Sequence, residues 1–160
     1  MSRNKRLSIL TAAEIEDLYG VPSFNESYQR FYFTLNDKER AELARIRQRK
    51  YRCIAVALLG YFKCKPILLN PSYKSMQDDL AFIARFHFKD LKFRRFSLKA
   101  DQKSRIYERV LSIAGVNSWK DKQHQPRLVE HLLACAESWV APRALFDAAI
   151  EFLAPQKIAI

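Results

Sequence analysis

Hydrophobic residues recur every three or four positions along most of the chain, which is the spacing of one face of an α-helix. The clearest case is 100–114, where Ile106, Val110 and Ile113 fall on one side. The chain has only three glycines, and these and the six prolines fall mostly where such patterns start or stop. We therefore predict an all-α fold, a compact bundle of about seven to eight short helices.

Three helix starts carry a capping signature, in which a small polar side chain is followed three residues later by glutamate. The pairs are Thr11 with Glu14, Ser23 with Glu26, and Asn36 with Glu39. They predict helices over 11–19, over 23–33 and from 36 onward. Whether the chain bends near Gln48, before the next helix, stays open at this point.

Five further helices follow from the apolar spacing. They are expected over about 50–62, 76–86, 100–114, 126–139 and 142–153, with Ser75 preceding the second and prolines at the first position of the last two. The segment 87–98 alternates only in part and is predicted to be irregular. The apolar run 53–62 has about half the length that a membrane span needs, so we interpret it as a buried core helix and expect no membrane partner.

The length of 160 residues fits one domain or two small ones. We divide the chain into a basic arm over 1–10, a helical domain over 11–155, and the start of a further segment over 156–160. An alternative has two subdomains that meet near 64–75.

The net charge of +11 is concentrated in two segments. Residues 36–52 contain seven basic and three acidic side chains, and 85–109 contain nine basic and three acidic ones, whereas 110–160 is neutral. Such clusters are often just the solvated faces of helices. Two of them in one small chain favour a polyanionic partner, and a phosphate backbone is the natural one.

Few residues are arranged for catalysis. The three cysteines form no CxxC pair and indicate a reducing cytoplasm, the adjacent Asp78 and Asp79 point in different directions on a helix, and no glycine-rich phosphate loop occurs. The three histidines, His87, His124 and His131, are not spaced by four residues and are expected in surface or capping roles. We expect no catalytic residue, no metal site and no cofactor.

Three motifs occur in order along the chain. They are LTxxExxxLYGxP at 10–22, FTLxxxER at 33–40 and PRxLFDxAIxxL at 142–153. With these motifs the chain resembles, over nearly its whole length, the N-terminal domain of the Tn-three family of replicative bacterial transposases, a module long catalogued as a domain of unknown function.

The resemblance implies a helical domain that binds double-stranded DNA at the terminal inverted repeats of a transposon. Full-length members carry a downstream RNase-H-like domain, whose acidic DDE triad uses divalent metal to cut and join strands. The resemblance therefore implies that these 160 residues recognise transposon ends, contact the remainder of the transposase chain, and are not themselves an enzyme. It also implies a bacterial, cytoplasmic protein that associates with the nucleoid when bound to DNA.

For DNA recognition we select the helix 100–114, where the family carries a histidine and this chain has Ile106. Gln102, Arg105 and Arg109 are predicted to contact bases in the major groove, because guanidinium and amide groups make bidentate contacts to guanine and adenine. The predicted phosphate contacts are Arg45, Arg47, Arg49, Lys50, Arg52, Lys92, Arg94, Arg95, Lys99 and Lys103. Phe93 and Phe96 are predicted to pack inward, and Arg3, Lys5 and Arg6 either enter a minor groove or stay flexible.

Two other classes of function stay open. The domain could be a protein interaction module within the transposase assembly, with non-specific DNA affinity. It could also be a small nuclease, although the sequence supplies no cluster of carboxylates or histidines for that chemistry.

Overall fold

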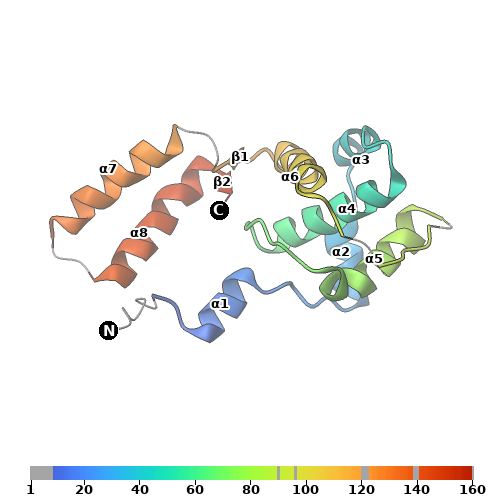
Figure 1. Cartoon of the computed structure of the whole chain (residues 1–160), viewed down its shortest axis with the longest axis horizontal. Helices are drawn as coiled ribbons and strands as arrows, with labels where there is room; N and C mark the ends of the chain where they lie inside the picture. The colour runs from blue at the N-terminus through green and yellow to red at the C-terminus, as the bar shows by residue number, and fades with distance from the viewer. Residues whose placement is uncertain (1–8, 90, 96, 120–122, 139–140, 160) are drawn as a thin grey trace. The chain divides into compact units, whose positions relative to one another are not determined.

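The computed structural model describes residues 9–89, 91–95, 97–119, 123–138 and 141–159, and in them it confirms the all-α prediction (Figure 1). The helices are α1 (Ala12–Tyr19), α2 (Glu26–Phe33), α3 (Asp37–Ala44), α4 (Arg49–Cys64), α5 (Tyr73–His87), α6 (Ala100–Ala114), α7 (His124–Ala136) and α8 (Pro142–Leu153). A short 3₁₀ turn, η1 (Ala154–Gln156), follows α8. The two-residue strands β1 (Asn117–Ser118) and β2 (Ile158–Ala159) pair with each other.

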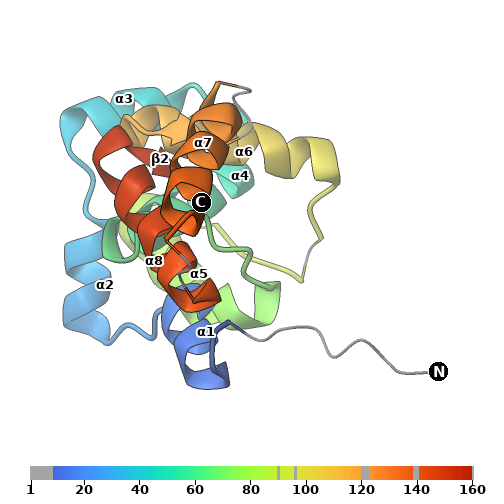
Figure 2. The ribbon, with the colours of Figure 1, turned by 90° about the vertical axis from the view of Figure 1, so that its left-hand side faces the viewer.

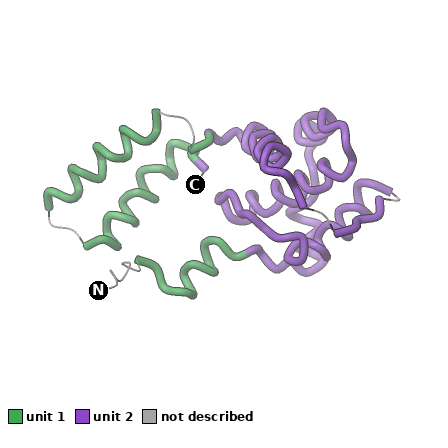
Figure 3. The backbone as a smooth tube through the Cα atoms, in the orientation of Figure 1, with its two compact units in different colours: residues 1–20, 118–158 green, residues 21–117, 159–160 purple. Residues whose placement is uncertain are grey.

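The chain divides into two compact units (Figure 3). Unit 1 comprises residues 1–20 and 118–158, and unit 2 comprises 21–117 and 159–160. The division falls near residues 20 and 117, whereas 64–75, the alternative meeting point of two subdomains, lies inside unit 2. Both predicted basic clusters belong to unit 2.

Two of the predicted capping boxes are confirmed. The Thr11 hydroxyl accepts from the Glu14 N–H at 3.2 Å, and the Asn36 side-chain oxygen accepts from the Glu39 N–H at 2.8 Å. In both boxes the glutamate carboxylate accepts from the backbone N–H of the capping residue. Gly115 ends α6 at a φ of 67°, a left-handed conformation that favours glycine, as predicted for this stop.

Three predicted helix starts are wrong by a few residues. Asn25 rather than Ser23 caps α2, because the Asn25 side-chain oxygen accepts the Tyr28 N–H. Ser72 rather than Ser75 caps α5, because the Ser72 hydroxyl accepts the Ser75 N–H. α7 begins at His124, so Pro126 occupies the third helical position rather than the first. A proline is tolerated there because N–H groups of a first turn have no partner within the helix.

Unit 2 is built around α4. Every residue from 53 to 62 is buried, which confirms the predicted core helix, and α2, α3, α5 and α6 pack around it. The approach of α2 is close: a Cβ atom at Gly60 would clash with the fully buried Phe33 ring, so any larger residue here would force that ring to move. Phe93 packs against this core as predicted, whereas Phe96 lies outside the described residues.

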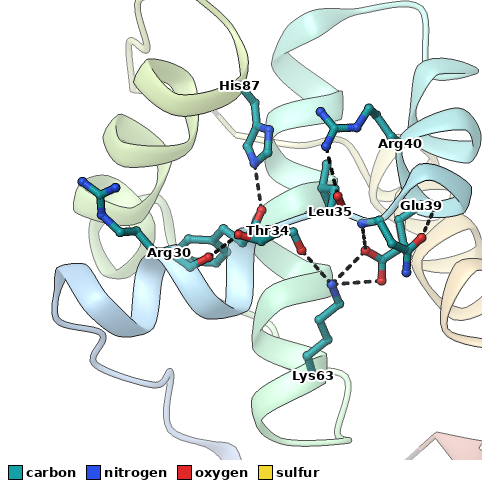
Figure 4. A network of polar contacts seen from close by, with 9 residues as sticks. Arg30, Thr34, Leu35, Glu39, Arg40, Lys63 and His87 are labelled. Carbon is teal, nitrogen blue, oxygen red and sulfur yellow. Dashed lines mark hydrogen bonds and ion pairs between the residues drawn. The ribbon is translucent and has the colours of Figure 1, made fainter.

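Polar contacts fix the connection between α2 and α3. The carbonyls of Phe33, Thr34 and Leu35 each accept a side-chain hydrogen bond, in the network of Figure 4. The donors are His87 Nε2 at 2.8 Å, Lys63 Nζ at 3.1 Å and Arg40 Nη2 at 3.1 Å, and Lys63 also pairs with the Glu39 carboxylate at 2.9 Å. These contacts satisfy carbonyls that the end of α2 leaves without helical partners.

Unit 1 contains α1, α7 and α8. α7 and α8 run side by side in both views of the ribbon (Figures 1 and 2). Arg143 on α8 pairs with Glu14 on α1 at 2.6 Å and with Asp147 at 3.1 Å. Among the helices that the structure describes in either unit, none is long and apolar enough to cross a membrane.

Candidate nucleic-acid interface

A hollow of about 430 Å³ opens on unit 2 between the α3–α4 turn and the exposed side of α6. Five predicted contact residues line it: Arg45, Arg47, Gln102, Arg105 and Arg109. Ile46 and Ile106 add apolar surface, Gln48 and Tyr51 line the side next to α4, and Asp101 adds an acid from the first turn of α6. The fold thus brings together two basic segments that are more than fifty residues apart in the sequence.

Arg52 holds the α3–α4 turn in place. Its guanidinium donates to the carbonyls of Ala44 and Ile46, with Nη2–O distances of 3.0 and 2.8 Å. These carbonyls belong to the end of α3 and to the turn that follows, where no helical N–H reaches them. Arg52 therefore uses its Nε and Nη2 donors to build the turn, and its role as a phosphate contact stays a prediction. The chain does bend here, over residues 45–48.

The first turn of α4 is unusually basic. Gln48, its capping residue, makes no side-chain cap hydrogen bond, and the turn contains Arg49 and Lys50 but no acid. The neighbouring α3 follows the ordinary pattern, with a capping box and with Asp37 and Glu39 in its first turn. Because a helix N-terminus carries partial positive charge, these cations add to the helix dipole of α4 instead of opposing it.

The predicted base-contacting residues on α6 differ in how far their side chains are exposed and already hydrogen-bonded within the protein. Arg105 is exposed at the rim of the hollow. Gln102 is partly engaged, because its side-chain carbonyl accepts from the Lys99 N–H at 3.1 Å and caps α6. The NH₂ end of its amide is the part that could donate to a base.

Arg109 is paired with an acid that the sequence analysis did not select. Its Nη1 lies 3.3 Å from Oε2 of Glu42 on α3, while Oε1 of the same carboxylate lies 3.2 Å from Nη1 of Arg45. The pair of Glu42 and Arg45 could have been found from its i, i+3 spacing. The pair of Glu42 and Arg109 could not, because it depends on how α3 and α6 pack.

Lys103 lies on another side of α6. Its Nζ hydrogen-bonds Asn70 Oδ1 and lies 5.6 Å from the centre of the Tyr107 ring, beside a separate hollow of about 220 Å³. Tyr107 donates its hydroxyl proton to the Leu69 carbonyl, and burial raises its pKa to about 12, which keeps it a donor. Lys103 therefore contributes to a different surface from Arg105.

The remaining predicted contacts are spread over the rest of unit 2. Lys92 lines a third hollow beside Arg85 and Tyr73, and Arg94, Arg95 and Lys99 are exposed. Arg3, Lys5 and Arg6 lie outside the described residues. The second basic segment thus supplies α6 to the first hollow and Lys92 to another.

A family model described as a domain of unknown function (DUF4158) matches residues 9–160. The chain belongs to the DUF4158 family. No curated protein and no solved structure matches it. The match covers both units, so the two together make up the region that the family describes.

The described part of this DUF4158 domain holds no group of three histidines, cysteines or acids that could bind a metal ion. Asp79 is buried and accepts from the Tyr61 hydroxyl at 2.6 Å and from Gln29 Nε2 at 2.8 Å, and burial raises its pKa. Its neighbour Asp78 is exposed, so the two carboxylates diverge as expected. Cys53 is buried, and burial raises the pKa of its thiol.

Proposed function

We propose that this domain binds double-stranded DNA through the hollow between the α3–α4 turn and α6. One observation carries the proposal: four arginines from two distant segments meet at this hollow, together with two glutamines and a single acid, Asp101. Guanidinium groups suit this task because their planar fork bonds both phosphate oxygens and guanine edges.

The two sides of the hollow would have different roles. The turn side, with Arg45 and Arg47, would contact phosphates and fix the position of the domain on the duplex, and the nearby Arg49 at the start of α4 would add a further phosphate contact. The α6 side would present Arg105, Arg109 and the Gln102 amide to base edges in the major groove. The positive N-terminus of α4, whose first turn contains no acid, adds to the attraction for phosphate.

The resemblance to replicative transposases extends the proposal to the target. We propose that the duplex is the terminal inverted repeat of a transposon and that the domain acts as the N-terminal module of a DDE transposase in the bacterial cytoplasm. Strand cleavage and its divalent metal would then belong to another part of that protein, and the role of these residues would be recognition.

A second candidate is an interaction module that contacts protein within a transposase assembly. The observation that favours it is the exposed apolar pair Val129 and Leu133, one turn apart on α7. This candidate predicts association with protein that is insensitive to salt. DNA binding through arginines predicts the opposite.

The test is a selection by the full chain from duplexes with a randomised centre, followed by titration of the selected duplex and a scrambled one at several salt concentrations. We expect enrichment of a defined sequence, binding that weakens steeply with salt, and a preference for the selected duplex. Arg105→Gln should reduce that preference by about 10-fold or more, whereas Arg49→Gln should weaken both duplexes alike.

The matched control is Arg127→Gln, which removes the same charge from an exposed position on α7 in unit 1. It should leave both affinities nearly unchanged. Selection without any enriched sequence would contradict specific recognition. Absence of duplex binding at low salt would contradict the proposed function altogether.

A further inference from the structure

We propose that Glu42 sets the balance between sequence-specific and non-specific binding at this hollow. It would act as a positioning residue that orients Arg109 and Arg45 and keeps Arg109, on the base-reading side, from bonding phosphates indiscriminately. The inference rests on the proposed function, because it concerns how the same hollow distinguishes one duplex from another.

The geometry is that of one carboxylate shared by two arginines. Each oxygen of Glu42 faces one guanidinium, at 3.2 Å for Arg45 and 3.3 Å for Arg109. An arginine side chain has five N–H donors, so each guanidinium keeps most of its donors for DNA. The carboxylate fixes where those donors lie, which lowers the conformational entropy that binding would otherwise cost.

The degree of burial gives the carboxylate its influence. The Glu42 side chain is 25% exposed and that of Arg109 is 37% exposed, whereas that of Arg45 is 65% exposed. Attraction between Glu42 and Arg109 is therefore less screened by water than that of a fully exposed pair. The same negative charge repels any phosphate that approaches Arg109, which disfavours binding by the backbone alone.

The pair is not needed to attach α6 to the fold. Leu43, next to Glu42 on α3, and Val110, next to Arg109 on α6, are both buried in the core around α4. Ion pairs that are partly exposed contribute little to folding stability. Loss of the carboxylate should thus change binding with little effect on unfolding.

The test compares Glu42→Gln with wild type on the selected and scrambled duplexes. We expect the affinity for the scrambled duplex to rise about 3-fold or more, since one repulsive charge is removed. The preference for the selected duplex should fall about 10-fold, the scale of one well-placed base contact. Glu42→Asp, which keeps the charge but is shorter, should lower the preference without raising affinity for the scrambled duplex.

Glu108→Gln is the matched control. Glu108 is exposed on α6 and accepts from the Ser104 hydroxyl at 3.1 Å, so this variant changes the net charge equally without touching Arg109 or Arg45. It should leave the preference unchanged. If Glu108→Gln and Glu42→Gln alter both affinities alike, the effect is one of net charge and the inference is overturned.

A double-mutant cycle separates positioning from other roles. In an Arg109→Gln background, Glu42→Gln should cause little further loss of preference. If the two substitutions lower the preference additively, Glu42 does not act through Arg109, and that assignment is overturned. A wild-type preference that survives Glu42→Gln would refute this inference and leave the proposed function standing, whereas a wild-type chain without preference would refute both.

Discussion

The two units use similar helices in different ways. In unit 2 one helix, α4, is surrounded by four others and buries ten consecutive residues. In unit 1 neither α1 nor α7 buries a single described residue, and α8 buries only Leu153. Amphipathic spacing alone therefore does not decide how much core a helix makes, because the number of neighbouring helices decides it.

The difference in core matters for the candidate site. A hollow whose side chains must keep fixed positions needs rigid elements beneath it, and α3, α4 and α6 share the core of unit 2. Unit 1 buries fewer side chains, and Arg143 joins two of its helices through an ion pair with Glu14. We therefore expect the two units to differ in stability and in their sensitivity to acid.

The largest expected effect comes from truncating the core of unit 2. Leu80→Ala removes a fully buried side chain from α5 and should lower the free energy of unfolding of unit 2 by about 3 kcal/mol. Leu133→Ala, at a position 62% exposed on α7, is the control and should change stability by less than about 0.5 kcal/mol.

Two signals distinguish the units in denaturant. Both tryptophans, Trp119 and Trp139, fall within residues 118–158, so fluorescence follows unit 1, whereas far-ultraviolet circular dichroism follows both units. Leu80→Ala should shift part of the dichroism transition and leave the fluorescence transition in place. Equal shifts of both signals would mean that the chain unfolds as one body, and the comparison would fail.

A smaller effect is expected at the α3–α4 turn. Arg52→Met removes the donors to two carbonyls and should lower the free energy of unfolding of unit 2 by about 1–2 kcal/mol. Arg49→Met removes the same charge from an exposed neighbour and should have almost no effect on unfolding. If both variants were equally stable, the turn would not depend on the hydrogen bonds of Arg52.

The smallest effect is an acid sensitivity of unit 1. Hydrogen bonds lower the pKa of Glu14 to about 2, against 4.5 for a free glutamate. The one from the Thr11 N–H has the largest effect, and the one from Arg143 comes next. A carboxyl whose pKa is lowered by folding stabilises the fold above its unfolded pKa and loses this effect as pH falls toward the folded value. The contribution of Glu14 should therefore fade between about pH 4.5 and 2.

Tryptophan fluorescence during denaturation at several pH values can measure this contribution. Glu14→Gln should be less stable than wild type at pH 7, and the gap should close as pH falls from 4.5 toward 2. Glu16→Gln, on the same helix, is the control because Glu16 does not hold Thr11 or Arg143 in the described structure. A gap that stays constant over this pH range would contradict the assignment to Glu14.

Much of the fold could be predicted because helix spacing and caps are local signals. The boxes at Thr11 and Asn36, the stop at Gly115 and the buried run 53–62 were all visible in the sequence. The caps of α2 and α5 were missed because two suitable polar residues stand close together at each start. Only the folded backbone decides which of the two accepts the N–H.

The site was harder to predict because it depends on packing over long sequence distances. The sequence predicts DNA contacts for all three of Arg52, Lys103 and Arg105, the first two to phosphates and the third to bases. In the folded chain Arg52 bonds the turn, Lys103 lies against Tyr107, and Arg105 remains at the hollow. Glu42 was overlooked for the same reason, since its link to Arg109 joins two helices that are distant in the sequence.

The arrangement of α6 has a consequence for how such a domain could diverge. Its core contacts are concentrated in Ile106, Val110 and Leu111, whereas positions 102 and 105 face the hollow. Substitutions at position 105 can therefore alter the chemistry of the surface while the hydrophobic anchor and the cap made by Gln102 stay the same. A lineage of such domains could thus acquire new recognition preferences through very few mutations, without a period of impaired folding in between.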